Sequence, residues 1–280
     1  SQIVNMLYNL VDRIYIGHMQ PAETVGKLAL TGVGVCLPII LVISAFAALI
    51  AMGGAPKASI SEGRGNLKAA EHIMGNSFSL LVLASVILTA VFQLFAEPLL
   101  LTFGASENTI GYALDYLRIY TLGTIFVQMT LGMNAYITAQ GFTTVSMKTV
   151  LIGAILNTIL DPIFIFALGL GVRGAALATI LSQTVSALWV LRFLTGSRTK
   201  WKLRPANLKP VPAVFLPCIA LCLSPSIRQS TDGLISVCFN ASLLEYGGDL
   251  AVGARTVLIS IMQLGMMPLQ GLTQGAQPII

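Results

Sequence analysis

The chain has 280 residues, of which 55% are hydrophobic and only 10% are charged, and its mean hydropathy is +0.84. These values exclude a soluble globular domain and predict an integral protein of the lipid bilayer. The net charge of +5 does not indicate a nucleic-acid-binding protein, because the basic residues lie in breaks between apolar segments rather than on one amphipathic face.

Apolar runs separated by charged breaks predict eight membrane-spanning helices. Most of these runs are long enough to cross a hydrocarbon core of about 30 Å as a helix. The predicted spans cover residues 2–17, 28–55, 73–95, 112–139, 147–169, 174–194, 211–243 and 250–280.

The basic residues predict the orientation of the chain in the membrane. If successive breaks lie on alternate sides, only Lys27 and Arg173 lie in the breaks on one side. We therefore expect the other side, with the amino terminus, to be cytoplasmic. Its basic residues are Lys57, Arg64, Lys68, Lys148, Arg192, Arg198, Lys200, Lys202, Arg204 and Lys209.

The longest polar break, SRTKWKLRPANLKP, divides the chain into two parts. Its prolines argue against one continuous helix. We predict an amino-terminal lobe of six helices over residues 1–196, a basic cytoplasmic linker over 197–210, and an incomplete second lobe over 211–280. A weak repeat at an offset of 222 residues pairs Ala29, Val35, Ile39, Gly53 and Pro56 with Ala251, Val257, Ile261, Gly275 and Pro278, which predicts parallel repeats.

A polar stripe runs along the first predicted helix. Asn5, Asn9 and Asp12 follow one another at spacings of four and three residues, so they share one face of the helix. Asp12 is thus a candidate for binding a cation or proton, supported by the two asparagines. The alternative is that Asp12, close to Gly17 and His18 at the expected membrane edge, is solvated.

The fifth predicted helix has one ionisable residue, Asp161, near the middle of the stretch LIGAILNTILDPIFIFALGLGV. A carboxylate at this depth is costly and usually marks an ion or proton pathway. Asn157 lies one turn earlier on the same face, and Pro162 removes a backbone donor and frees the carbonyl near Thr158. This group predicts a cation or proton site; a structural contact between helices is the alternative.

Small residues open the sixth predicted helix, GVRGAALATILSQT. Gly171, Gly174 and Ala178 recur at a spacing that allows neighbouring helices to approach closely. Thr179 offers a hydroxyl group to a site shared with the fifth helix. Its alternative role is a hydrogen bond to the preceding turn of its own helix.

The eighth predicted helix carries glutamines and methionines that suit a broad, wet cavity. Gln263 and Gln270 share a face, with Met262 and Met266 beside them. Together with Tyr136 of the fourth span, they are the predicted lining of a substrate cavity. Packing between helices is an equal alternative for the glutamines.

The four cysteines lie within apolar segments and have no metal-binding partner nearby in the sequence. We therefore expect buried thiols. We also expect no cofactor, and no metal other than a Na+ ion at the cation site. The cysteines are Cys36, Cys218, Cys222 and Cys238.

Four segments resemble the multidrug and toxic compound extrusion (MATE) family of twelve-helix, cation-coupled exporters. They are NLVDRIYIGH in the first predicted helix, NAYITAQG at Asn134–Gly141, NTILDPIFIF in the fifth and GAALATILSQ in the sixth. The resemblance implies a cation site in the amino-terminal lobe at Asp12, Asn157, Asp161 and Thr179, the residues that helical spacing also nominates. It further implies that the chain is truncated after the eighth helix and does not transport by itself.

The resemblance implies a secondary antiporter, not an enzyme, in the plasma membrane of a bacterium or archaeon. It would export amphipathic or cationic drugs or metabolites in exchange for H+ or Na+; its oligomeric state is open. One alternative, a flippase for lipid-linked oligosaccharides, requires basic residues in the cavity, and only Arg228 and Arg255 lie midspan in the later helices. A remote alternative is an intramembrane aspartyl protease with Asp12 and Asp161 as its dyad. No GxGD motif surrounds either residue.

Overall fold

The computed structural model describes residues 15–16 and 25–207, and the single residues 262, 266 and 269. Over these residues the chain is helical, with no β-strand. The stretches that are long and apolar enough to cross a membrane are Leu28–Gly63, Leu67–Leu94, Thr143–Ala167 and Gly171–Thr195. The chain is therefore an all-α integral membrane protein, as its hydropathy predicts.

The five spans predicted between residues 28 and 194 all coincide with helices, some of them divided. The predicted seventh span, most of the first and nearly all of the eighth lie outside the described residues and stay predictions. In chain order the elements are α2 (Lys27–Val35), α3 (Leu37–Gly63), α4 (Leu67–Leu94), α5 (Ala96–Thr102), α6 (Ile110–Leu122), α7 (Thr124–Gln128), the π-helical turn η2 (Met129–Met133), α8 (Asn134–Ala139), α9 (Thr143–Pro162), the π-helical turn η3 (Ile163–Ala167), α10 (Gly171–Thr195) and the 3₁₀ turn η4 (Pro205–Asn207).

Two helices extend past the predicted apolar segments, α3 at its last turns and α4 at its first, because these turns are polar. α3 continues through Pro56 to Gly63, where the hydroxyl of Ser61 donates to the Lys57 carbonyl at 3.0 Å. α4 begins after Asn66, whose side chain caps the helix by accepting a hydrogen bond from the Ala69 amide at 3.1 Å. Hydropathy alone does not detect turns of this kind, which explains why the predicted ends at residues 55 and 73 are wrong.

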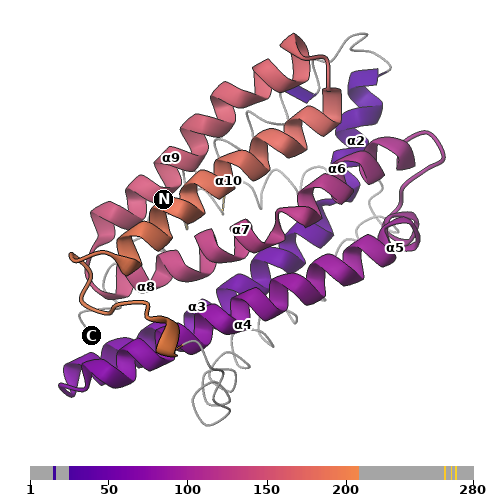
Figure 1. Ribbon diagram of the computed structural model, residues 1–280. Helices are drawn as coiled ribbons and strands as arrows, with labels where there is room; N and C mark the ends of the chain where they lie inside the picture. The colour runs from indigo at the N-terminus through magenta and orange to yellow at the C-terminus, as the bar shows by residue number, and fades with distance from the viewer. Residues whose placement is uncertain (1–14, 17–24, 208–261, 263–265, 267–268, 270–280) are drawn as a thin grey trace.

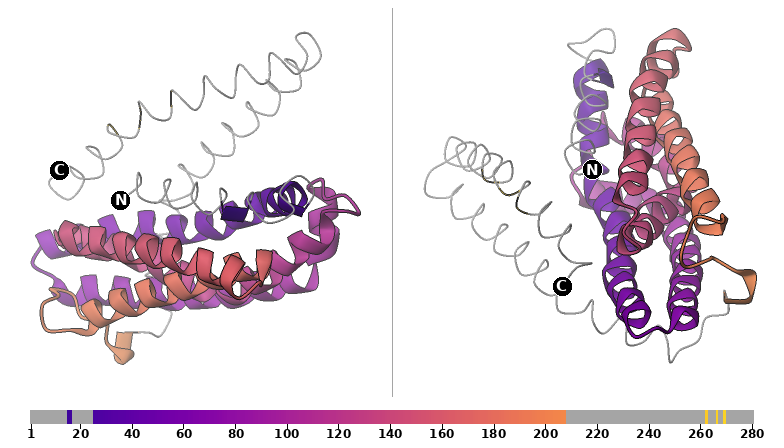
Figure 2. Two further views of the ribbon diagram at one scale, coloured as in Figure 1. Left: turned by 90° about the horizontal axis from the view of Figure 1, so that it is seen from above. Right: turned by 90° about the vertical axis from the view of Figure 1, so that its left-hand side faces the viewer.

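Two helical hairpins flank a divided central helix. Figure 1 shows α3 and α4 along one side of the bundle, α9 and α10 along the other, and α6, α7 and α8 in line between them. Figure 2 shows from two further directions that these helices share one long axis. The central helix packs against α3, α4 and α10, and α9 packs against α10 and α8.

Two apolar clusters of buried residues fill the bundle, one toward each end. The first joins α2, the start of α3, the end of α4, α6 and the start of α10, with Ile39, Tyr116 and Val172 among its members. The second joins α3, α4, α8 and the end of α10, and includes Trp201. We call this second end the basic end, because the turn between α3 and α4 and the segment after α10 meet there with most of the basic residues. These are Arg64, Lys68, Lys148, Arg192, Arg198, Lys200, Lys202 and Arg204.

Candidate cation site

The two polar side chains predicted to share a face of the fifth span are in direct contact on α9. Asn157 Nδ2 donates a hydrogen bond to Asp161 Oδ2 at 2.7 Å, and the residues are 2% and 0% exposed. A carboxylate shielded from water needs hydrogen-bond donors or a cation to balance its charge. The Asn157 amide is neutral and adds no charge to the carboxylate. The pair therefore offers oxygen atoms of the kind that can bind a cation, and a carboxylate that can take up a proton.

The backbone beside Asp161 departs from regular α-helical hydrogen bonding. Pro162 has no amide hydrogen, and the Ile163 amide donates to the Leu160 carbonyl. The following turn, η3, is π-helical, and the Leu168 amide donates to the Ile163 carbonyl at 2.9 Å. π-helical turns of this kind occur frequently at functional sites. The backbone is thus irregular after Asp161, whereas the free carbonyl predicted near Thr158 stays a prediction.

Small residues bring α10 close to α9 on both sides of this pair. A Cβ atom at Gly153 would lie 2.8 Å from Ser186 Oγ, and that hydroxyl donates to the Thr149 carbonyl at 3.2 Å. A Cβ atom at Gly174 would lie 2.6 Å from the carbonyl oxygen of Phe164. The close approach predicted from Gly174 is therefore observed. Gly174 approaches the main chain at Phe164, which cannot move aside as a flexible side chain can.

The same contacts fix the position of Thr179 along the bundle. The two helices are antiparallel, with Gly153 beside Ser186 at one level and Gly174 beside Phe164 at another. Counting along both helices from these contacts places Thr179 at the level between Asn157 and Asp161. Thr179 is 7% exposed, and its hydroxyl donates to the Ala175 carbonyl at 3.0 Å. Both roles considered for Thr179 remain available, because a hydroxyl oxygen that donates can also accept or bind a cation.

The contact at Gly174 makes a testable prediction about the fold around the site. Replacing Gly174 with valine forces the side chain against the backbone at Phe164, and overpacking of this kind costs about 1–3 kcal/mol. We expect a lower thermal unfolding temperature in detergent. The control is Gly111→Val, because a Cβ atom at Gly111 meets nothing within 4 Å. Equal unfolding temperatures for the two variants would contradict the packing described here.

The remaining predicted site residues are not brought to this pair by the described structure. Asn5, Asn9, Asp12, Gln263 and Gln270 lie outside the described residues, so their roles stay predictions. Met262 and Met266 are described and are 62% and 51% exposed. Tyr136 is fully buried and donates to Ser77 Oγ at 2.5 Å, against Gly54. In this structure Tyr136 thus supports the packing of α8 on α4 and α3, and its cavity role stays a prediction.

Buried polar residues on the central helix were missed by the sequence reasoning. Gln128 is fully buried and donates to the Ile43 carbonyl of α3 at 2.8 Å. Thr130, in η2, donates to the Gln183 carbonyl of α10 at 3.2 Å. The sequence carried a signal for them, because Thr124 and Gln128 are one turn apart within an apolar span. The partners of Gln128 and Thr130 are main-chain carbonyls on other helices, which no side-chain pattern reveals.

The chain matches the model of the MatE family over residues 1–163. It is 25% identical over 280 residues to the multidrug export protein MepA of Staphylococcus haemolyticus. That match covers all of this chain and 61% of MepA. The chain thus spans about three fifths of the length of the curated relatives that it matches.

Solved structures of similar proteins share the fold. A crystal structure of MATE in the bent conformation superposes with a TM-score of 0.91 at 26% identity, covering 99% of this chain and 60% of that one. An outward-facing multidrug resistance transporter of the MATE family gives a TM-score of 0.88 at the same identity and coverage. The arrangement of helices around Asp161 is therefore one that these transporter structures also contain.

Proposed function

Since the chain belongs to the MatE family, we propose that it supplies the cation-binding lobe of a secondary antiporter. The transporter exports amphipathic or cationic drugs or metabolites across the plasma membrane in exchange for H+ or Na+. The observation that carries this proposal is the buried, hydrogen-bonded pair of Asn157 and Asp161 beside a break in helical hydrogen bonding. The relatives named as multidrug export proteins support the substrate class.

The chemistry of the pair suggests how a cation is exchanged for a substrate. A proton or Na+ at Asp161 removes the net charge of the pair and so lowers the cost of enclosing it in the bilayer. An empty, ionised Asp161 instead favours a conformation in which water or a counter-ion reaches it. Coupling requires the cation and the exported compound to prefer different conformations of the transporter. The exported compound therefore need not bind at Asp161 itself.

Transport driven by an imposed gradient tests this function. The product of the complete open reading frame is reconstituted into vesicles loaded with ethidium, an organic cation. We expect a gradient of H+ or of Na+ to drive ethidium across the membrane, and the effective gradient identifies the coupling ion. The control is the same vesicle with equal ion concentrations on both sides. Failure of both gradients to move ethidium or any other amphipathic cation would refute the antiporter.

A further inference from the structure

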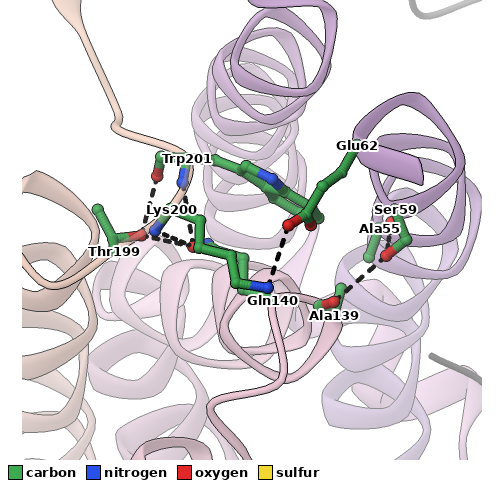
Figure 3. A network of polar contacts seen from close by, with 8 residues as sticks. All are labelled: Ala55, Ser59, Glu62, Ala139, Gln140, Thr199, Lys200 and Trp201. Atoms are coloured by element: carbon green, nitrogen blue, oxygen red, sulfur yellow. Dashed lines mark hydrogen bonds and ion pairs between the residues drawn. The ribbon is translucent and has the colours of Figure 1, made fainter. Parts of the chain in front are cut away.

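The segment that follows α10 returns to the bundle and is bound there by one glutamine. Gln140, 2% exposed at the end of α8, accepts three hydrogen bonds at its Oε1 atom. The donors are the hydroxyl of Thr199 at 2.7 Å and the amides of Lys200 at 2.8 Å and Trp201 at 3.1 Å. Figure 3 shows these three groups converging on Gln140. One buried side chain thus accepts from two consecutive amides and a hydroxyl group some 60 residues later.

Two acidic residues of the α3–α4 hairpin bind the same segment from the other side. Glu62, in the last turn of α3, pairs with Lys200 at 3.1 Å, as Figure 3 shows. Glu71, in the second turn of α4, accepts a hydrogen bond from the Lys202 amide at 3.0 Å and lies 3.6 Å from the Arg204 guanidinium. The acidic groups therefore hold main chain as well as charged side chains, so the contact is more than an exposed ion pair.

The burial of Trp201 and two main-chain contacts complete the attachment of this segment. Trp201 is fully buried and belongs to the cluster formed by α3, α4, α8 and α10. The Leu203 amide donates to the Leu194 carbonyl of α10 at 3.0 Å. Asn207 lies so close to α4 that a Cβ atom at Gly75 would collide with its main chain and its Cβ. The segment is thus attached to α3, α4, α8 and α10.

We propose that residues 199–207 are a strap that ties the α3–α4 hairpin to α8 and α10 at the basic end. The strap holds this end of the lobe as one rigid body. It also fixes the position on α4 from which the chain continues. In transport, a role that rests on the proposed function, the α3–α4 hairpin, α8 and α10 then move together at this end. The strap lies within the basic linker predicted over residues 197–210, and the division of the chain into lobes on either side of that linker stays a prediction.

Limited proteolysis distinguishes a strap from a free linker. Trypsin can cleave after Lys200 and Lys202, whereas Pro205 blocks cleavage after Arg204. Cleavage requires local unfolding, which the bonded amides and the buried tryptophan resist. In the reconstituted full-length protein we expect these two bonds to be cut slowly. Gln140→Leu leaves the amides of Lys200 and Trp201 without their acceptor and should speed cleavage by about tenfold or more, while the Thr199 hydroxyl keeps the Trp201 carbonyl as an acceptor at 2.9 Å.

A control substitution at another glutamine and a second variant that detaches the strap distinguish release of the strap from general misfolding. Gln93→Leu also removes a glutamine that bonds main chain, at the Arg118 carbonyl near the other end of the bundle, and should leave strap cleavage unchanged. Gly75→Val pushes Asn207 off α4 and should speed cleavage, whereas Gly111→Val should not. Each variant is compared at equal helix content by circular dichroism.

The outcomes separate the strap from the transport function. Rapid cleavage of the wild-type strap, or equal slow rates in wild type, Gln140→Leu and Gly75→Val, would overturn the proposal. Slow cleavage in wild type with faster cleavage in both variants supports it, even if no gradient drives ethidium transport. If transport occurs, Gln140→Leu should also slow it relative to Gln93→Leu.

Discussion

Replacing Asp161 with asparagine is expected to abolish cation-driven efflux while leaving the fold intact. Asparagine has nearly the same shape and can still meet Asn157, so the packing of α9 on α10 is kept. It carries no charge and takes up no proton, so a cation gradient no longer favours one conformation over another. We expect the driven rate of ethidium efflux to fall about a hundredfold, near the upper range of coupling between two sites.

The same substitution at another aspartate provides the control. Asp115 pairs with Arg173 at 2.9 Å, and both side chains are largely exposed, 42% and 61%. Exposed pairs of this kind contribute little to stability, so Asp115→Asn should leave efflux close to wild type. Cells expressing each variant from the complete reading frame are compared at equal protein level in the membrane. Efflux driven equally by the ion gradient in wild type and Asp161→Asn would remove Asp161 from the coupling mechanism.

The largest loss of stability is expected from Trp201→Ala. Trp201 is the largest fully buried side chain in the described part of the chain, and it contacts helices from both hairpins. Truncation of a buried tryptophan leaves a cavity that the neighbouring helices fill only in part, at a cost of about 3–5 kcal/mol. We expect a clear fall in the thermal unfolding temperature measured in detergent, and faster tryptic cleavage within the strap.

The second tryptophan of this chain tests whether the loss comes from burial. Trp189 lies on α10 and is 38% exposed, so Trp189→Ala removes the same side chain from a surface that faces outward. Its unfolding temperature should stay near that of wild type. A similar loss at both positions would mean that the burial of Trp201 does not stabilise the basic end.

Local patterns account for what the sequence predicts correctly. Long apolar runs give the order and approximate position of the described membrane-spanning stretches, because a segment in lipid must satisfy its backbone internally. The contact between Asn157 and Asp161 follows from helical spacing alone, since residues four apart on one helix lie over each other. No knowledge of another helix is needed for either inference.

Contacts between distant segments account for what the sequence does not show. The position of Thr179 along the bundle, between Asn157 and Asp161, depends on the register of α9 against α10. The contacts of Gly153 and Gly174 set this register. The strap is polar, basic and proline-containing, so its composition suggests a solvated linker. Its attachment depends on Gln140, a residue that nothing nearby in the sequence marks as an acceptor for main chain. The breaks in the central helix are likewise hidden, because Gly123 and Gly132 lie in an apolar run.

The hydrogen bonds of the central helix restrict how the lobe can deform. Gln128 bonds α3, Thr130 bonds α10 and Tyr136 bonds α4, so this helix is attached on several sides around its circumference. Rotation about its own axis would separate all three bonds at once. Bending at its divided turns or tilting of the outer hairpins breaks fewer bonds. We therefore expect the helix from α6 to α8 not to rotate about its own axis while the rest of the lobe changes shape around it.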